Sequence, residues 1–301
     1  MAEKFEVKLS DGTPMKGWTW QVKEPCACFC LITGMNEYAK RYARLAEWLN
    51  EKNISVWVLD ALGQGLNAES VEKQEIWPAD GFEKNVEGIH QMNSLARRTG
   101  VPVILIGHSM GSFLTQRLMQ RYPDSADRYI LCGSNGGQGT LMKIAYRMAR
   151  RQVNDANREQ PCPKLSSLGL GGYTRAVKNR RTDLDWLSYD EENVDRYIAD
   201  PWCGHENTGS FWLEFLKGMA RLWDAKAMAD VAKDRPVLII AGQEDPVGRC
   251  GKGPKWLTDR YRALGVKNVT LKLYPHMRHE IHNEKGYLEV YGDILKFVMK
   301  E

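Results

Sequence analysis

The chain of 301 residues is 43% hydrophobic and 27% charged, which suits one α/β domain with an insertion and a sizeable core. Its net charge of +4 includes no long block of lysine and arginine, so nothing indicates a nucleic-acid partner. The first residues lack the apolar run of a signal peptide, no stretch nears the roughly 18 apolar residues of a membrane span, and seven cysteines do not suit a disulfide framework. These features predict a cytoplasmic protein with reduced thiols.

The first predicted element is a hairpin, with arms at residues 3–9 and 16–22 that are rich in aromatic and β-branched side chains. After it, apolar strands alternate with helices. The predicted strands are 26–32, 54–60, 101–107, 128–133, 235–242 and 269–275, and the predicted helices are 38–50, 82–98, 112–122, 253–264 and 286–300. Because the strand runs are continuously apolar rather than alternating, they predict a mostly parallel sheet covered by helices on both faces.

This alternation stops after the sixth strand. Residues 135–230 contain no strand-like run and predict a mainly helical cap. We therefore expect the cap to be an insertion into one core domain, which is formed by residues 1–134 and 231–301.

A Gly-x-Ser-x-Gly motif follows the most apolar strand, with Ser109 at its centre and Gly107 and Gly111 on either side. The strand ends immediately before the motif and an amphipathic helix starts immediately after it. This context predicts a nucleophile elbow, a turn so tight that only glycine fits two residues before and after the serine. Ser109 is therefore the predicted nucleophile.

A serine nucleophile needs a histidine base and a carboxylate that orients the base. In this architecture the three follow in the order serine, acid, histidine. The strand 235–242 leads to Glu244 and Asp245. We choose Asp245, because the Asp-Pro step marks the turn and the acid belongs in the loop beyond the strand.

The last strand leads into His276, His279 and His282, and spacing alone leaves all three open as the base. A helical zinc site needs two histidines four residues apart, and these are three apart. Alternate residues Cys26, Cys28 and Cys30 extend too far along a strand to share one metal. We therefore predict neither a metal nor another cofactor.

The segment 242–284 resembles the carboxyl-terminal part of the monoacylglycerol lipase and lysophospholipase family of α/β-hydrolases. That family's last motif reads Tyr-Pro, two variable residues, Arg-His-Glu, an apolar residue, a variable residue and Asn-Glu. The matching residues here are Tyr274, Pro275, Arg278, His279, Glu280, Ile281, Asn283 and Glu284. The resemblance implies an α/β-hydrolase fold with His279 as the catalytic base, and it places His276 and His282 at variable positions.

The resemblance extends over nearly the whole chain. Residues 33–49 are similar to the family's His-Gly segment, which continues with Glu and Arg-Tyr. This implies that the backbone N–H groups of Met35 and Met110 form the oxyanion hole. Thr33 departs from the family pattern, which usually has histidine there. Gln64 stands where many members have histidine, although some lysophospholipase-like members have glutamine. Residues 181–204 resemble a cap segment of bacterial members.

The predicted cap includes an amphipathic helix at residues 141–153. Its apolar face carries Leu141, Ile144, Ala145 and Met148, and its basic face carries Lys143, Arg147, Arg150 and Arg151. Such a helix can make transient contact with an anionic membrane surface. Its apolar face can equally pack on the core domain.

These features together predict a serine hydrolase of carboxylic esters, acting on a lipid-like small molecule such as a monoacylglycerol or lysophospholipid. A serine aminopeptidase is the first alternative, since a cap carboxylate could bind a free α-amine. The candidates are Glu191, Glu192, Glu206 and Glu214. A ligand-binding receptor that retains the triad is the second alternative. Nothing in the sequence indicates an oligomeric state.

Overall fold

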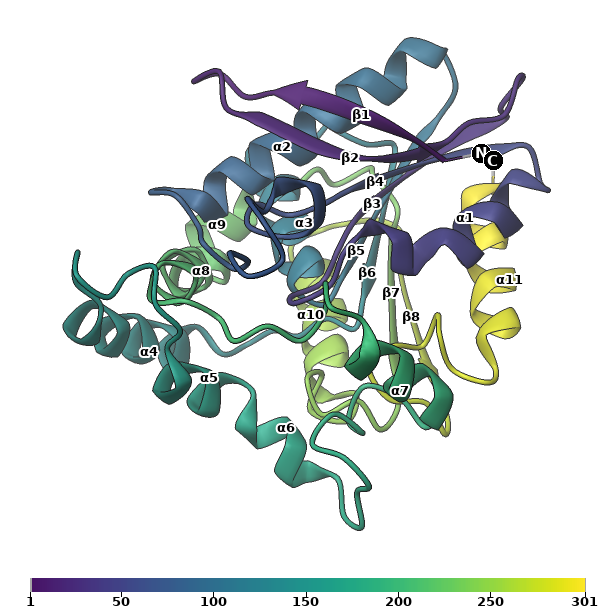
Figure 1. The fold of residues 1–301 in the computed structure, drawn as a ribbon. Helices are drawn as coiled ribbons and strands as arrows, with labels where there is room; N and C mark the ends of the chain where they lie inside the picture. Colours follow the sequence, from purple (N-terminus) through teal and green to yellow (C-terminus); the bar gives the residue numbers. More distant parts are fainter. Residues whose placement is uncertain (1, 301) are drawn as a thin grey trace.

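The computed structural model describes residues 2–300 and contains one eight-stranded sheet (Figure 1). The strands are β1 (Ala2–Lys8), β2 (Pro14–Trp20), β3 (Ala27–Ile32), β4 (Ile54–Leu59), β5 (Val103–His108), β6 (Arg128–Cys132), β7 (Val237–Gly242) and β8 (Val269–Tyr274). Their order is β1-β2-β4-β3-β5-β6-β7-β8. The β1–β2 and β2–β4 pairs are antiparallel and the other neighbours are parallel. The prediction of a hairpin followed by a mostly parallel sheet is confirmed.

Burial explains why the central strands have unbroken apolar sequences. Every residue of β3, β4, β5 and β7 is buried. The edge strands β1 and β8 keep several exposed or half-buried positions. A strand that is covered on both faces favours apolar side chains at each position, whereas an edge strand tolerates polar ones.

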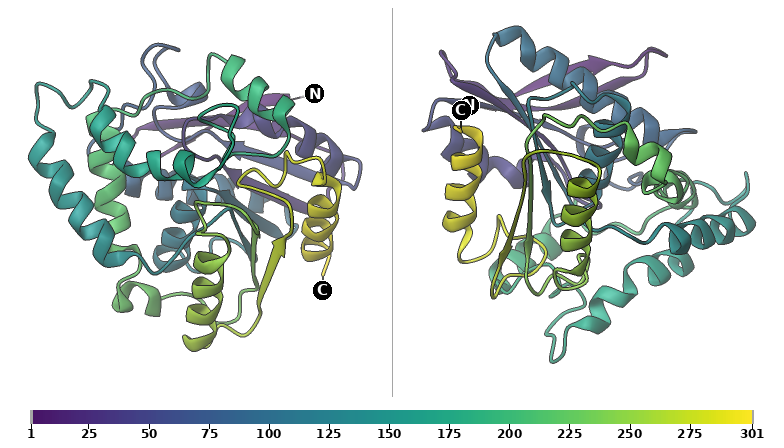
Figure 2. Two further views of the ribbon diagram at one scale, coloured as in Figure 1. Left: turned by 90° about the horizontal axis from the view of Figure 1, so that it is seen from below. Right: turned by 180° about the vertical axis from the view of Figure 1, so that it is seen from behind.

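Helices cover both faces of the sheet, as the right-hand view of Figure 2 shows. The core helices are α1 (Ala43–Asn50), α2 (Gly81–Ala96), α3 (Met110–Arg121), α10 (Lys252–Ala263) and α11 (Tyr287–Val298), with short 3-10 turns η1 (Ala39–Tyr42), η2 (Gly65–Asn67) and η3 (Arg97–Thr99). α1 and α11 cover one face, where Leu49 and Ile294 join one apolar cluster. α2, α3 and α10 cover the other face, where Ile89, Leu118 and Leu257 join a second cluster.

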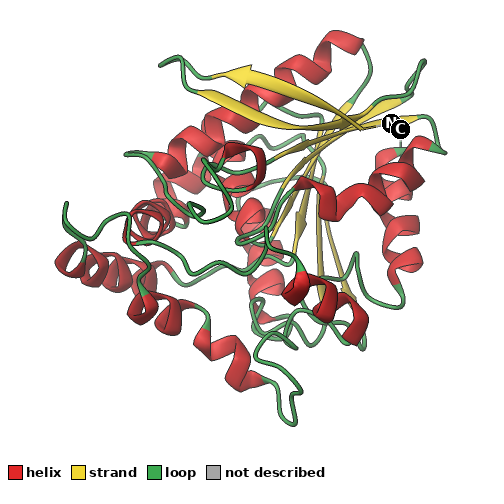
Figure 3. Cartoon of the chain, in the orientation of Figure 1, coloured by secondary structure: helices red, strands yellow, loops and turns green. Residues whose placement is uncertain are grey.

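The insertion after β6 consists of helices and loops (Figure 3). Its helices are α4 (Gly139–Gln152), α5 (Pro163–Gly169), α6 (Gly171–Ala176), α7 (Glu191–Ala199), α8 (Gly209–Leu222) and α9 (Ala225–Ala229). α4 packs along α8, and α8 packs on α2 and α3. The predicted helical insertion after the sixth strand is therefore confirmed. Its treatment as a cap separate from the core stays a prediction. Phe211 and Leu222 of α8 belong to the main core cluster, so α8 packs as part of the core.

Two of the inserted helices begin at side-chain caps. The Asp190 carboxylate accepts a hydrogen bond from the Glu192 N–H, and the Thr208 hydroxyl accepts one from the Phe211 N–H. Such caps satisfy N–H groups that have no partner inside the helix. They fix the points at which α7 and α8 leave the loops near the site described below.

Parallel strands bring their carboxyl ends to one edge of the sheet. Ser109 follows β5, Asp245 lies three residues beyond the end of β7, and His279 lies in the loop after β8. Ligand sites of open α/β sheets lie at this edge. Within residues 2–300, no helix combines the length and apolar character needed to cross a bilayer.

Candidate active site

Ser109 lies at the turn between β5 and α3, in a backbone conformation that is uncommon for a residue other than glycine. Its φ is 51° and its ψ is −118°. A Cβ atom on Gly107 would come within 2.2 Å of the Gly111 carbonyl oxygen, and one on Gly111 would come within 2.3 Å of the Ile32 carbonyl oxygen. No real side chain tolerates such distances, so both glycines are required for the turn.

Asp245 and His279 form a buried hydrogen-bonded pair. His279 Nδ1 donates to Asp245 Oδ2 at 3.1 Å, and the side chains are 2% and 0% exposed respectively. The other Asp245 oxygen accepts the Val247 N–H at 2.8 Å. Burial alone would lower the pKa of His279, but the charge and the hydrogen bond of Asp245 outweigh it and raise that pKa above 6.5. An imidazole oriented and polarised in this way suits a general base.

Glu244, the acid that the sequence analysis did not choose, faces away from this pair. It accepts a hydrogen bond from the Tyr189 hydroxyl, and its carboxylate lies 3.6 Å from His276 Nδ1. The His276 side chain is 92% exposed. The structure therefore brings Asp245 together with His279, whereas Glu244 and His276 meet at the surface.

His282 is buried, although its variable position gave no sign of a structural role. The segment that carries the three histidines is a series of turns, so the helical geometry used to reject a zinc site does not apply to it. The His282 ring stacks on Tyr42 with centroids 4.9 Å apart and lies 4.7 Å from the His108 ring. Burial, reinforced by His108, lowers the pKa of His282 to about 3, so its imidazole is neutral at ordinary pH.

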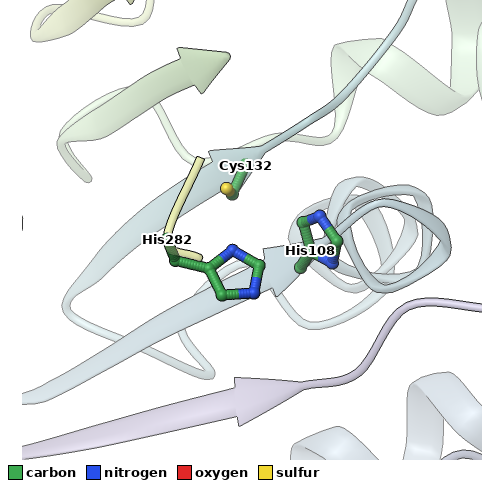
Figure 4. A group of neighbouring side chains, drawn as sticks. All are labelled: His108, Cys132 and His282. Carbon is green, nitrogen blue, oxygen red and sulfur yellow. The ribbon is translucent and has the colours of Figure 1, made fainter. Parts of the chain in front are cut away.

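His108, Cys132 and His282 come together in the interior, as Figure 4 shows. Their potential ligand atoms lie within 4.8 Å of one another. Burial raises the pKa of the Cys132 thiol well above its usual range, so the thiol is protonated here. His108 Nδ1 already faces Tyr42 and Glu37. We therefore assign no metal to this cluster and regard it as packing in the interior.

Glu37 links the loop that carries Met35 to the elbow. It accepts hydrogen bonds from the Gly34 N–H and the Tyr42 hydroxyl, both at 2.6 Å, and lies 3.0 Å from His108 Nδ1. Burial would raise the pKa of Glu37, but the interactions with His108 and the charge of Arg41 lower it to about 2. A buried carboxylate therefore fixes the loop that leads into residue 35.

Arg41 joins this carboxylate to the histidine loop. Its guanidinium contacts Glu37 at 2.9 Å and binds both oxygens of Glu280 at 2.6 and 2.8 Å. Asn193 of α7 donates a further hydrogen bond to Glu280 at 2.7 Å. Burial would raise the pKa of Glu280, yet Arg41 holds it well below its usual range. Glu37, Arg41 and Glu280 match the family motifs, but those motifs indicated no role for them. The sequence features that could have indicated a role are the Glu-x-x-x-Arg spacing and the glutamate that follows His279.

The two residues predicted to supply oxyanion-hole N–H groups flank one cavity. Met35 and Met110 both line it, together with Ser109 and His279. Met110 is the first residue of α3, where backbone N–H groups lack partners within the helix. The use of the two N–H groups as an oxyanion hole stays a prediction.

The two departures from the family pattern are both buried. The Thr33 carbonyl oxygen lies against Gly111, where a Cβ would meet it at 2.7 Å. Gln64 donates to the Glu75 carboxylate at 2.9 Å. Thr33 thus abuts the elbow through its backbone, and Gln64 bonds within its own loop region.

The cavity has a volume of about 520 Å³ and is mostly apolar. It extends from Ser109 and His279 to residues of the inserted helices. The inserted residues that line it include Leu141, Ile144, Met148, Leu165, Trp212 and Phe215. Leu141, Ile144 and Met148 remain 55%, 48% and 38% exposed, whereas Ala145 of the same face packs against the main core cluster.

Of the four cap carboxylates considered for binding an α-amine, Glu206 lines this cavity. Glu214 is buried on α8, where it accepts the Asp80 N–H and lies 3.5 Å from the Lys217 ammonium. Glu191 and Glu192 lie on the first turn of α7. Glu206 is therefore the residue at which an aminopeptidase activity can be tested.

Comparisons with known proteins identify relatives of this chain. The model of the family described as serine aminopeptidase S33, Hydrolase_4, matches residues 23–286. A monoacylglycerol lipase of Mycolicibacterium smegmatis is 25% identical over 92% of this chain and 89% of its own. A phospholipase of Bacillus subtilis is 30% identical over 91% of this chain and 95% of its own.

A solved structure shares the whole architecture. The thermostable carboxyl esterase from Bacillus coagulans superposes with a TM-score of 0.89 at 22% identity, covering 99% of this chain and 97% of the esterase. At this identity the likeness shows the fold, which is that of an α/β-hydrolase. With the family match over most of its length, the chain belongs to the serine aminopeptidase S33 family of α/β-hydrolases, among the monoacylglycerol lipases and lysophospholipases that its sequence resembles.

Proposed function

We propose that this protein hydrolyses carboxylic esters of lipid-like small molecules through an acyl-enzyme on Ser109. The observation that carries the proposal is the buried Asp245–His279 pair, whose histidine lines the same mostly apolar cavity as Ser109. The names of the relatives in Mycolicibacterium smegmatis and Bacillus subtilis, a monoacylglycerol lipase and a phospholipase, support the same substrate class.

In the proposed mechanism, Ser109 Oγ attacks the ester carbonyl while His279 Nε2 takes the hydroxyl proton. The Met35 and Met110 N–H groups stabilise the oxyanion, and Asp245 stabilises the imidazolium. The tetrahedral intermediate collapses, and His279 returns the proton to the leaving alcohol. Water, deprotonated by His279, then attacks the acyl-enzyme and releases the acid. The chemistry needs no cofactor.

The acyl chain is proposed to lie along the apolar wall formed by α4, α5 and α8. Each buried methylene is worth about 0.8 kcal/mol, so kcat/KM for p-nitrophenyl esters is expected to increase by about 100-fold or more from acetyl to octanoyl. A panel from acetyl to palmitoyl, extended to monoacylglycerols and lysophospholipids, measures this. A flat or falling profile would contradict a lipid-like substrate.

The same panel tests the aminopeptidase alternative when it includes aminoacyl p-nitroanilides. Glu206→Gln is the discriminating variant, because Glu206 is the cap carboxylate that lines the cavity. We expect ester turnover to change little and arylamide turnover to be negligible in both proteins. Arylamide turnover that is faster than ester turnover in the wild type, and that is lost in Glu206→Gln, would favour the aminopeptidase. If Ser109→Ala keeps full biological activity, the receptor alternative is favoured.

We further propose that α4 makes transient contact with an anionic membrane surface, from which a lipid could enter the cavity. Its exposed apolar side chains support this, as do Arg147, Arg150 and Arg151 on the same helix. Replacing Leu141 and Ile144 by aspartate is expected to reduce sedimentation with anionic vesicles. The control is Leu288→Asp on α11, where leucine is 58% exposed. Equal sedimentation of all three proteins would argue against the contact.

A cytoplasmic location is proposed on a separate ground. All seven cysteines are free, and they include Cys26 and Cys250 at the surface. Free exposed thiols are typical of a reducing compartment.

A further inference from the structure

Part of the insertion is bound directly to the loop that carries His279. This insertion segment, residues 184–190, is the last part of the loop between α6 and α7. Arg278 Nη1 donates to the carbonyl oxygens of Asp185 and Ser188 at 2.6 and 3.3 Å. The Glu280 N–H donates to the Leu187 carbonyl oxygen at 2.7 Å. Residues on either side of His279 therefore hold the segment by its backbone.

Glu284 closes the same junction. Its buried carboxylate accepts the N–H groups of Tyr189 and Arg278, each at 2.9 Å. The Arg278 guanidinium also lies over the Tyr189 ring at 3.7 Å. A hydrogen bond to a charged group is stronger than one between neutral groups. A guanidinium stacked on an aromatic ring adds a cation–π attraction. The 184–190 segment and the histidine loop thus behave as one packed unit.

This junction places Trp186 against the His279 ring. The two ring centroids lie 5.2 Å apart with an interplanar angle of 45°, and Trp186 is 9% exposed. Tyr173 supports the indole, with centroids 5.3 Å apart. His108 of the elbow lies 4.8 Å from His279. The imidazole is therefore in contact with a ring from the insertion and a ring from the core.

We propose that Trp186 is a positioning residue that holds the His279 imidazole in the orientation needed for catalysis and shields the Asp245–His279 pair from water. This inference rests on the proposed hydrolase function. One hydrogen bond to Asp245 leaves the imidazole free to tilt about its side-chain torsions. A large rigid indole restricts that tilt, because an aromatic side chain buries about 150–250 Å² and has few rotatable bonds. Small displacements of a catalytic group cost up to about 100-fold in rate.

The test uses p-nitrophenyl acetate, whose short acyl group makes little use of the cavity wall that Trp186 also lines. Trp186→Ala and Trp186→Leu are expected to lower kcat by about 10- to 100-fold with little change in KM. Trp186→Phe keeps a ring beside His279 and is expected to recover most of the loss. Trp202→Ala is the matched control, because this insertion tryptophan contacts Tyr38 and lies outside the cavity lining.

A second readout separates positioning from a general loss of structure. His279 is expected to react faster with diethyl pyrocarbonate in Trp186→Leu than in the wild type, with peptide mass spectrometry locating the modified residue. Trp202→Ala is expected to match the wild type. If Trp186→Ala does not fold, the Leu and Phe variants carry the comparison.

The possible outcomes separate the role of Trp186 from the proposed hydrolase function. A wild-type protein without esterase activity contradicts the proposed function. An active wild type with Trp186→Leu at the same kcat and the same His279 reactivity overturns the role of Trp186 alone. A rise in KM at constant kcat would also overturn it, since Trp186 would then be a wall of the cavity only.

Discussion

Replacing Ser109 by alanine is expected to lower kcat for ester hydrolysis by about 10⁵-fold while leaving the fold intact. The hydroxyl oxygen is the only atom removed, and the acyl-enzyme cannot form without it. Alanine keeps the Cβ and the backbone constraints of the elbow, so the thermal midpoint should stay close to that of the wild type. Burst kinetics with p-nitrophenyl esters and labelling by a fluorophosphonate measure the loss directly.

Companion variants identify the base and its partner. His279→Ala is expected to cost about as much as Ser109→Ala, because members of a triad act as a unit. Wild-type kcat/KM is expected to fall on acidification around a midpoint above 6.5, since the raised pKa of His279 means that the imidazole becomes protonated earlier. His276→Ala is the control, as this side chain is 92% exposed and meets Glu244 instead of Asp245. An active His279→Ala protein would falsify the assignment.

Replacing Arg41 by alanine is expected to destabilise the protein by about 3–5 kcal/mol. Arg41 lies between two carboxylates, Glu37 and Glu280, whose side chains are each 2% exposed. Its removal leaves both charges buried without their common counter-ion. Urea denaturation at neutral pH, with the free energy of unfolding extrapolated to water, measures the difference.

The pH dependence of this difference has a definite sign. In the wild type, His108 and Arg41 hold the pKa of Glu37 below the ordinary value of 4.5, and Arg41 does the same for Glu280. The stabilisation is therefore present above that value and is lost as pH falls. The gap between wild type and Arg41→Ala should therefore be largest at neutral pH and shrink below about 4.5. Arg196→Ala is the control, because its pair with Glu192 is exposed and is worth about 0.5 kcal/mol or less. Equal losses in the two variants would contradict a special role for Arg41.

The sheet and the elbow could be predicted from the sequence because their signals are local. Continuous apolar runs marked the parallel strands, and the elbow needed only Gly107, Ser109 and Gly111 in the right context. The predicted helix at 38–50 was correct in place, although its first turn is the 3-10 helix η1. Asp245 followed from the rule that the acid lies in the loop beyond a strand.

Local sequence patterns do not distinguish the three histidines of the last loop. Spacing left His276, His279 and His282 equivalent, and only the family resemblance singled out one of them. The structure separates them by burial: His276 is exposed, while His282 stacks on Tyr42 inside the core. That difference arises from a chain of turns, which has no periodicity from which a buried face could be read.

The contacts that organise the site join residues far apart in the sequence. Arg41 and Glu280 are separated by 239 positions, and Trp186 reaches His279 from an irregular segment of the insertion. No pattern within either segment specifies its partner. Such pairings depend on how the whole chain folds, and the sequence predicted only the fold class.

The backbone at Ser109 has a consequence for the stability of the protein as a whole. A residue other than glycine at φ 51° and ψ −118° costs on the order of 1–3 kcal/mol, which the rest of the fold must offset. The amino acid that would relax this position is glycine, which has no nucleophile. Selection for thermal stability alone would therefore favour glycine at position 109, which would inactivate the enzyme. Retaining serine keeps the activity at a cost in stability.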